Sequence, residues 1–217
     1  MSIEKHIKNI NRKYLIGYML LNYGLFGYLS KLFVLNINDY GGFFQKLIHP
    51  TNFIGLLVIP LCLIMEGIIS SDLKHQLVFL RLKNALPGCR AFTEIALQDQ
   101  RIDMKKMEKI LHSHIPHDPK EQNSAWYSIY KKHSDKTIVF ESHKLFLLTR
   151  DLASLTFIFL PATLIAHLIF DTTTKSIWIH MGILLITLIL TILACQNYGK
   201  RFVANVLAEE ISLPVEE

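Results

Sequence analysis

Apolar residues gather in four long runs along the chain, and charged residues fill the gaps between the runs. Each run is close to the roughly 20 residues that a helix needs to cross a hydrocarbon core about 30 Å thick. The first run is longer than the apolar core of a signal peptide and no small-residue cleavage site follows it, so we interpret it as a retained span. The predicted spans are residues 14–35, 53–70, 152–170 and 177–196. The pattern predicts an all-α integral membrane protein with four transmembrane helices in two hairpins.

Basic residues predict how these spans are oriented. Residues 71–150 contain 14 Lys and Arg and 9 Asp and Glu, a net charge of +5, whereas the loop inside each hairpin holds a single lysine, Lys46 or Lys175. Because basic segments stay on the cytosolic side, both termini and the middle are expected in the cytosol. The predicted regions are a tail and first hairpin (1–70), a basic helical cytosolic domain (71–151), and a second hairpin with a tail (152–217).

The first part of the cytosolic domain has a helical pattern followed by an aperiodic stretch. Leu73, Leu77 and Leu80 lie at helical spacing, which predicts an amphipathic helix over residues 72–86. No breaker separates it from the second span, so we expect one continuous helix that ends at Pro87-Gly88. Residues 89–102 show no clear period and are expected to be irregular.

Two aspartates mark helix starts further along. Asp103 is expected to cap a short helix, and Asp118, followed by Pro119, is expected to begin another. A final helix from about Ser134 should continue without interruption into the third span. The apolar faces expected for the last two helices consist of Trp126, Ile129 and Tyr130, and of Ile138, Leu145 and Leu148.

Composition and motifs narrow the classes of function. The chain is 51% hydrophobic and 19% charged, and its three cysteines are scattered, which does not indicate a disulfide framework or a zinc site. Phosphate-binding loops, nucleophile elbows and H-E-x-x-H motifs are missing from the sequence. These observations predict no cofactor and favour a non-enzymatic protein.

Polar residues and prolines inside the spans are the first candidate functional positions. Ionisable side chains at membrane depth are costly and tend to face a bundle interior or water. Prolines near mid-span are either packing kinks or hinges. The candidates are Asn22, Lys31, Pro60, Glu66, Pro161 and His167.

The candidates in the cytosolic domain are of two kinds, a histidine cluster and residues for interaction with a partner. A histidine cluster in a turn, His112, His114 and His117, is compatible with a metal ion, but a solvated loop is the favoured interpretation. Aromatics interleaved with lysines leave nucleotide or nucleic-acid binding as a minor alternative, because the positive charge is already explained by anionic lipid. The candidates for interaction are Arg90, Trp126, Tyr127, Tyr130, Arg150 and Asp151.

Several segments of the cytosolic domain carry a resemblance. These are residues 86–92 (LPGCRAF), 99–103 (DQRID), 122–127 (QNSAWY) and 146–151 (FLLTRD). Over about residues 70–155 the chain resembles a family of small bacterial four-span inner-membrane proteins to which no activity is attached. The resemblance implies a bacterial inner-membrane location and a specific role for the cytosolic domain. The architecture is also similar to that of membrane effectors in bacterial defence systems, an analogy of plan alone.

Three hypotheses for function follow. The leading one is a non-enzymatic inner-membrane protein whose cytosolic domain senses a partner or ligand and couples it to the transmembrane bundle, as a membrane-perturbing effector or channel-like oligomer. The second is a membrane-anchored scaffold or regulatory subunit. The third is a small interfacial enzyme that would depend on Glu141, His143, Asp151 or the histidine cluster. The expected partners are the lipid bilayer and a protein, either a different chain or further copies of this one.

Overall fold

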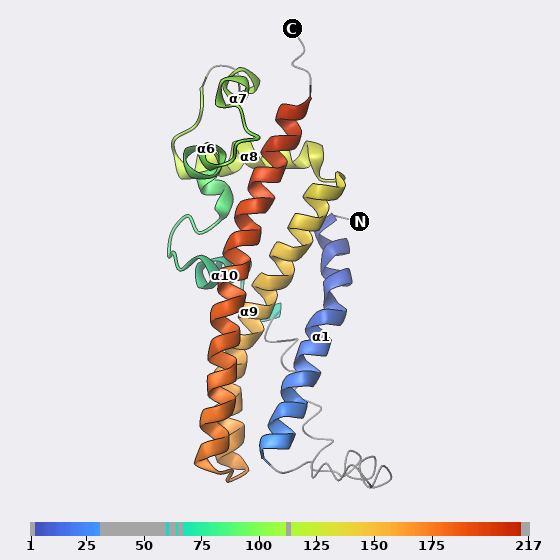
Figure 1. Ribbon diagram of the computed structural model, residues 1–217, viewed down its shortest axis with the longest axis vertical. Coiled ribbons are helices and arrows are strands. Elements are labelled where there is room, and N and C mark those ends of the chain that lie inside the picture. The colour runs from blue at the N-terminus through green and yellow to red at the C-terminus, as the bar shows by residue number, and fades with distance from the viewer. Residues whose placement is uncertain (1–2, 31–59, 61–63, 65–66, 112–113, 214–217) are drawn as a thin grey trace. The chain divides into compact units, whose positions relative to one another are not determined.

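The computed structural model describes residues 3–30, 60, 64, 67–111 and 114–213. Helices dominate these residues, and no strand occurs among them, which confirms the all-α class (Figure 1). The longest elements are α1 (Ile3–Leu29), α9 (Thr137–Ile169) and α10 (Thr174–Ser212). The chain divides into two compact units. Unit 1 comprises Met1–Lys8, Ser71–Arg150 and Ile192–Glu217, and unit 2 comprises Asn9–Ser70 and Asp151–Thr191.

Unit 2 is built on α1, α9 and α10. Tyr18 of α1 hydrogen-bonds through its hydroxyl to the Thr156 hydroxyl of α9 at 2.7 Å. The Ser176 hydroxyl of α10 donates to the carbonyl of Leu29 at 2.9 Å. At the turn between α9 and α10, His167 Nε2 lies 3.2 Å from His180 Nδ1, so the two helices pack as neighbours within the unit.

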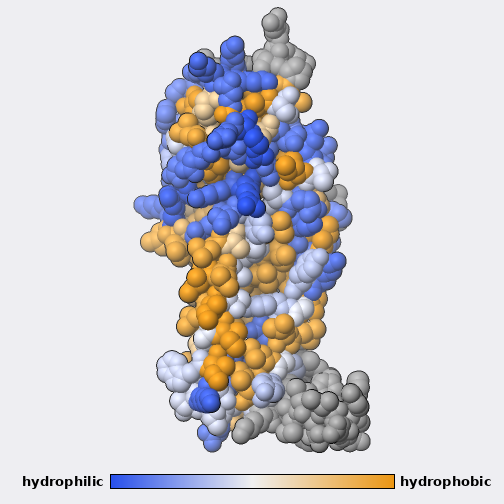
Figure 2. All heavy atoms as spheres, viewed as in Figure 1, coloured by the Kyte–Doolittle hydropathy of each residue, from blue (hydrophilic) through white to orange (hydrophobic). Residues whose placement is uncertain are grey.

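Among the described residues, α9 and α10 are the helices that are long and apolar enough to cross a membrane. Only 11% of the most apolar window of α10 is buried within the protein, and 39% of that of α9. A core helix of a soluble protein would have most of this surface covered. Figure 2 shows hydrophobic residues gathered over the apolar stretch of α10. The first predicted span is described only as far as residue 30, and most of residues 53–70 lie outside the described residues.

Unit 1 adds short helices to the ends of the long ones. These are α5 (Ser71–Phe79), a 3₁₀ turn η1 (Pro87–Arg90), a π turn η2 (Ala91–Ile95), α6 (Ala96–Gln98), α7 (Met104–Ile110) and α8 (Pro119–His133). Buried Glu210 of α10 pairs with Lys132 at 2.8 Å and with His133, which fixes the end of α8 against the end of α10.

The two aspartate caps are confirmed. Asp103 accepts hydrogen bonds from the backbone N–H groups of Lys105 and Lys106 before α7. Asp118 accepts from those of Lys120 and Glu121 before α8, and Pro119 occupies the first helical position. Each side chain satisfies backbone donors that have no partner inside the helix. Trp126, Ile129 and Tyr130 of α8 are buried, as predicted.

The prediction for residues 72–86 is wrong in both extent and face. The chain leaves the helical conformation at Ile69 and Ser70 and then forms α5, which ends at Phe79. Ser70 stands directly before α5, at a position where serine favours a new helix start. Leu80 has a φ of 52°, which ends α5. Leu73 and Leu80 are exposed, whereas the buried residues of α5 are Lys74, His75, Val78 and Phe79.

Two further predictions need correction. Residues 89–102 were expected to be irregular, yet most of them form the consecutive turns η1, η2 and α6, whose 3₁₀ and π geometry has no 3.6-residue period. Helix α9 does run without interruption into the third apolar run, but Ile138 is 45% exposed. The buried positions of α9 in unit 1 are instead Val139, His143, Phe146, Leu147 and Arg150, with Ser142.

The C-terminal end of α10 differs from the expected tail. The helix continues past the apolar run to Ser212 and contributes Phe202, Val203, Val206 and Leu207 to the buried core of unit 1. Their spacing places them on one helical face. The predicted boundaries of the three regions stay a prediction, and the second part of α10 belongs with the compact unit that contains residues 71–150.

Candidate functional site: a cavity in unit 1

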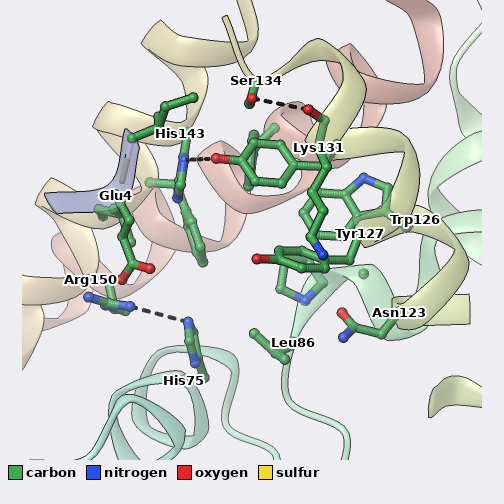
Figure 3. A pocket seen from close by; sticks show the side chains of 17 residues that line it. Glu4, His75, Leu86, Asn123, Trp126, Tyr127, Lys131, Ser134, His143 and Arg150 are labelled. Atoms are coloured by element: carbon green, nitrogen blue, oxygen red, sulfur yellow. Dashed lines mark hydrogen bonds between the residues drawn. The ribbon is translucent and has the colours of Figure 1, made fainter. Parts of the chain in front are cut away.

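A cavity of about 490 Å³ lies within unit 1 (Figure 3). Its wall is formed by residues of α1, α5, α8, α9 and α10 and by the segment around η1. The side chains fall into an aromatic group, a charged group and a polar edge. The lining residues are Ile3, Glu4, His75, Leu86, Pro87, Gly88, Asn123, Trp126, Tyr127, Tyr130, Lys131, Ser134, His143, Phe146, Leu147, Arg150 and Phe202.

Aromatic rings form one side of the cavity. Trp126 and Tyr130 stack with centroids 5.8 Å apart, and Phe202 meets both edge-on at 5.2 and 5.3 Å. His143 lies parallel to Phe202 at 4.5 Å. The four rings come from α8, α9 and α10, so their mutual contacts join three helices and fix the shape of this wall.

A charged group lies at the opposite end in Figure 3, where Arg150, His75 and Glu4 are close together. Arg150 is 2% exposed, and its Nη1 lies 3.5 Å from His75 Nε2. Burial, followed by the charge of Arg150, lowers the pKa of His75 to about 4, so this histidine is neutral near pH 7. A hydrogen bond with Lys8 lowers the pKa of Glu4, and the charge of Arg150 lowers it further.

The edge of the cavity is polar and reaches solvent. Tyr127 is 47% exposed, and Lys131 lies with its Nζ 4.8 Å from the centre of the Tyr127 ring. Gly88 closes the wall beside them, because a Cβ at this position would lie 2.4 Å from Asn123 Oδ1 and 2.8 Å from Trp126 Cε3. Only glycine permits so close an approach. The exposed side chains of Tyr127 and Lys131 thus lie where the cavity meets solvent.

A tyrosine and a histidine form a polar pair inside the cavity. The Tyr130 hydroxyl lies 3.1 Å from His143 Nδ1. Burial raises the pKa of Tyr130 to about 12. Burial also lowers the pKa of His143 to about 4. His143 precedes the apolar run that begins at Leu152. A general acid or base works best with a pKa near the working pH, and these two groups are moved away from it in opposite directions.

Four of the six predicted cytosolic candidates meet at this cavity. Trp126, Tyr127, Tyr130 and Arg150 all line it. Arg90 does not; its Nε pairs with Glu94 at 3.2 Å. Asp151 is buried and belongs to unit 2.

The predicted membrane candidates are placed in part. Asn22 is buried and donates to the Tyr18 carbonyl of its own helix at 2.8 Å. His167 is buried beside His180, and its Nδ1 lies 2.7 Å from the Thr172 hydroxyl. Pro161 lies exposed within α9, which continues through it, and Pro60 is helical and exposed. Lys31 and Glu66 lie outside the described residues.

The histidine cluster is described only in part, since His112 lies outside the described residues. The rings of His114 and His117 have centroids 6.3 Å apart and are both exposed. Within the described part of the chain, no group of three or more His, Cys, Asp or Glu side chains is arranged to hold a metal ion.

The lining residues that were not anticipated from the sequence include Glu4, His75 and Phe202. They lie in three separate segments of unit 1, and only the fold brings them together. Phe202 carried a usable signal, because residues 202, 203, 206 and 207 have helical spacing after the last basic pair. Glu4 and His75 carried none.

The chain matches no protein-family model, and comparisons with curated proteins and with solved structures likewise give no match.

Proposed function

We propose that this chain is a non-enzymatic, multi-pass protein of the bacterial inner membrane, in which unit 1 binds a ligand and passes the signal to membrane-spanning helices. The observation that carries the proposal is the composition of the cavity wall. Phe146, Leu147 and Arg150 of α9 and Phe202 of α10 line the cavity. The same two helices are long and apolar enough to cross a membrane.

Continuity of α9 and α10 supplies the route for the signal. Each helix contributes residues to both units and is continuous along its length, although Pro161 lacks the N–H that would bond to the preceding turn of α9. A ligand that shifts side chains around Phe146 or Phe202 therefore acts on the backbone of a helix that continues into the apolar segment. Coupling requires the ligand to interact differently with two states of the protein, and Pro161 supplies a position at which α9 can change its bend.

The membrane arrangement in this proposal has four spans, with both termini and unit 1 in the cytosol. It is supported by the four apolar runs of the sequence and by the concentration of Lys and Arg outside the hairpin loops. Four spans are few to enclose a pathway, so altered permeability of the membrane would require several copies of the chain.

The proposal is tested by membrane potential and dye entry in bacteria that express the full chain from a titratable promoter. The variant is Tyr127→Ala, which removes an exposed part of the cavity wall, and the matched control is Ile138→Ala, at an exposed apolar position that does not line the cavity. We expect depolarisation by the unaltered chain and by Ile138→Ala, and a changed response for Tyr127→Ala at equal membrane levels.

Two outcomes would contradict the proposal. One is the absence of depolarisation at every expression level, which would favour a membrane-anchored scaffold. The other is an equal response of Tyr127→Ala and Ile138→Ala, because the cavity would then play no part in the output.

A further inference from the structure

We propose that the ligand of the unit 1 cavity is a planar aromatic anion, with its ring on the wall formed by Trp126, Tyr127 and Tyr130 and its negative group at Lys131. This inference rests on the proposed function and names the class of ligand that the cavity selects. The three aromatic residues and the lysine all belong to α8, so one helix presents both recognition elements.

The aromatic wall favours a flat ring over a flexible chain. Trp126 and Tyr130 are stacked at an interplanar angle of 14°, and the ring centroid of Tyr127 lies 5.8 Å from that of Tyr130. Tyr127 is 47% exposed and is the ring most open to an incoming aromatic system, whereas Trp126 and Tyr130 are largely covered by each other and by Phe202. A volume of about 490 Å³ lies within the range of roughly 300–1,000 Å³ that is typical of small-molecule sites.

The charges around the cavity favour an anion. The cations are Lys131 at its edge, Arg150 within it and Lys8 beside Glu4, whereas Glu4 is the one carboxylate among the lining residues. The lining residues therefore hold two basic side chains and one acidic side chain, a net formal charge of +1, and Lys8 pairs with Glu4 at 2.9 Å from outside the lining. His75 and His143 are neutral near pH 7 and do not add to this charge. A buried guanidinium such as Arg150 strengthens the local potential, because burial reduces solvent screening.

The position of Lys131 makes it the contact for the anionic group. Its ammonium lies over the Tyr127 ring at 4.8 Å, so an aromatic ligand against this wall has its edge beside a cation. The lysine is exposed and its side chain can adjust to the ligand. Asn123 and Ser134 supply further hydrogen-bonding groups along the same edge.

Tryptophan fluorescence of the purified full chain in detergent micelles tests this inference directly. The chain holds two tryptophans, Trp126 in the cavity wall and Trp178, which is 73% exposed in α10. A Trp178→Phe background therefore leaves Trp126 as the reporter. The probes are the four common nucleoside 5′-monophosphates, each compared with its neutral nucleoside and with inorganic phosphate.

We expect at least one aromatic anion to quench Trp126 saturably, and its neutral counterpart and inorganic phosphate to bind at least about tenfold more weakly. In the same background, Lys131→Gln should weaken binding by about fivefold or more. Lys136→Gln, which removes the same charge from an exposed position outside the cavity, should not change it.

Three results would overturn the inference: no quenching by any of the aromatic anions, equal affinity for a neutral counterpart or for phosphate alone, or equal affinity of Lys131→Gln and Lys136→Gln. Binding is measured without reference to membrane potential, so the two proposals fail separately. Failure to bind these probes, with a depolarisation that still depends on Tyr127, removes the ligand class only. Binding without any depolarisation removes the proposed function only.

Discussion

Three phenylalanine rings of unit 1 are buried, whereas Phe157 and other large apolar side chains of the long helices in unit 2 are exposed. Phe92, Phe146 and Phe202 of unit 1 are at most 4% exposed. In unit 2, Phe157 is 51% exposed, and Ile186 and Leu190 are 60% exposed. A protein surrounded only by water rarely exposes a continuous apolar surface of this kind.

The difference shows where each unit obtains its stability. Unit 1 gains its hydrophobic free energy from contacts within the protein, so a large side chain removed from its core leaves a cavity. The exposed side chains of unit 2 have fewer protein contacts to lose, so truncating them leaves little enclosed space. Substitutions of the same chemical kind should therefore have unequal effects in the two units.

The largest difference is expected for phenylalanine. Phe202→Ala removes a ring that contacts Trp126, Tyr130 and His143, and should lower the free energy of unfolding by about 3–5 kcal/mol. Phe157→Ala in α9, at an exposed position, should cost about 0.5 kcal/mol or less. Thermal unfolding in detergent micelles, followed by Trp126 fluorescence, measures both. Equal costs would mean that the two units do not differ in this way.

The next effect concerns pH and belongs to unit 1. Burial holds the pKa of His75 and His143 at about 4 in the folded state, compared with the ordinary value of 6.5. Between these values the unfolded state binds more protons, so the free energy of unfolding falls as the pH falls from about 6.5 to about 4. Each unit of pKa difference contributes about 1.4 kcal/mol. The groups that act on these histidines are Glu4, Lys8, Lys74 and Arg150.

Unfolding midpoints in micelles at pH 7 and pH 4.5 measure this effect. His75→Gln cannot take up a proton, so its midpoint should depend less on pH than that of the unaltered chain. Parallel pH profiles for the two proteins would contradict the burial of a neutral His75.

A smaller effect, with opposite signs in the two units, is expected for two glycines of α10. A Cβ at Gly199 would lie 2.8 Å from Phe79 Cζ and 3.2 Å from Phe146 Cε2, and both rings are buried. Gly199→Ala should therefore cost about 1–3 kcal/mol. Gly182 in unit 2 has no atom within 4 Å of a Cβ position, so Gly182→Ala should stabilise the helix by about 0.5–1 kcal/mol. The same unfolding measurement gives both signs, and a stabilising Gly199→Ala would contradict the close packing of α10.

Local signals in the sequence predicted local structure well. Asp103 and Asp118 act on N–H groups two and three residues away, so the pattern contains all the partners. The face of α5 could not be read in this way. Leu73 is exposed and His75 is buried because the packing partners of His75, Phe146 and Arg150, lie about 70 residues further along the chain. Tertiary contact decided against the local leucine pattern.

The cavity shows the same limit. Trp126 and Tyr130 were predicted as core residues of a helix, which they are. Their place in the wall of the cavity depends on Glu4, Arg150 and Phe202, which come from three other segments. The periodicity of one segment cannot indicate that distant segments meet in the fold. Glu4 and His75 have charged or polar neighbours in the sequence, which are typical of surface positions.

The smallest effect compares helix starts in the two units. Asp118 accepts from the N–H groups of Lys120 at 2.9 Å and Glu121 at 3.2 Å, and its negative charge lies at the positive end of α8. At the start of α10, Thr173 Oγ1 accepts from the Ser176 N–H at 3.4 Å. This is one longer backbone hydrogen bond, and its acceptor is a neutral hydroxyl. Asp118→Ala should therefore cost about 1 kcal/mol and Thr173→Ala a few tenths. Hydrogen exchange at the first amides of α8 and α10 measures each cap locally. Equal exchange rates in Asp118→Ala and the unaltered chain would mean that the stability of this helix start comes from the buried aromatic face of α8 instead of the aspartate.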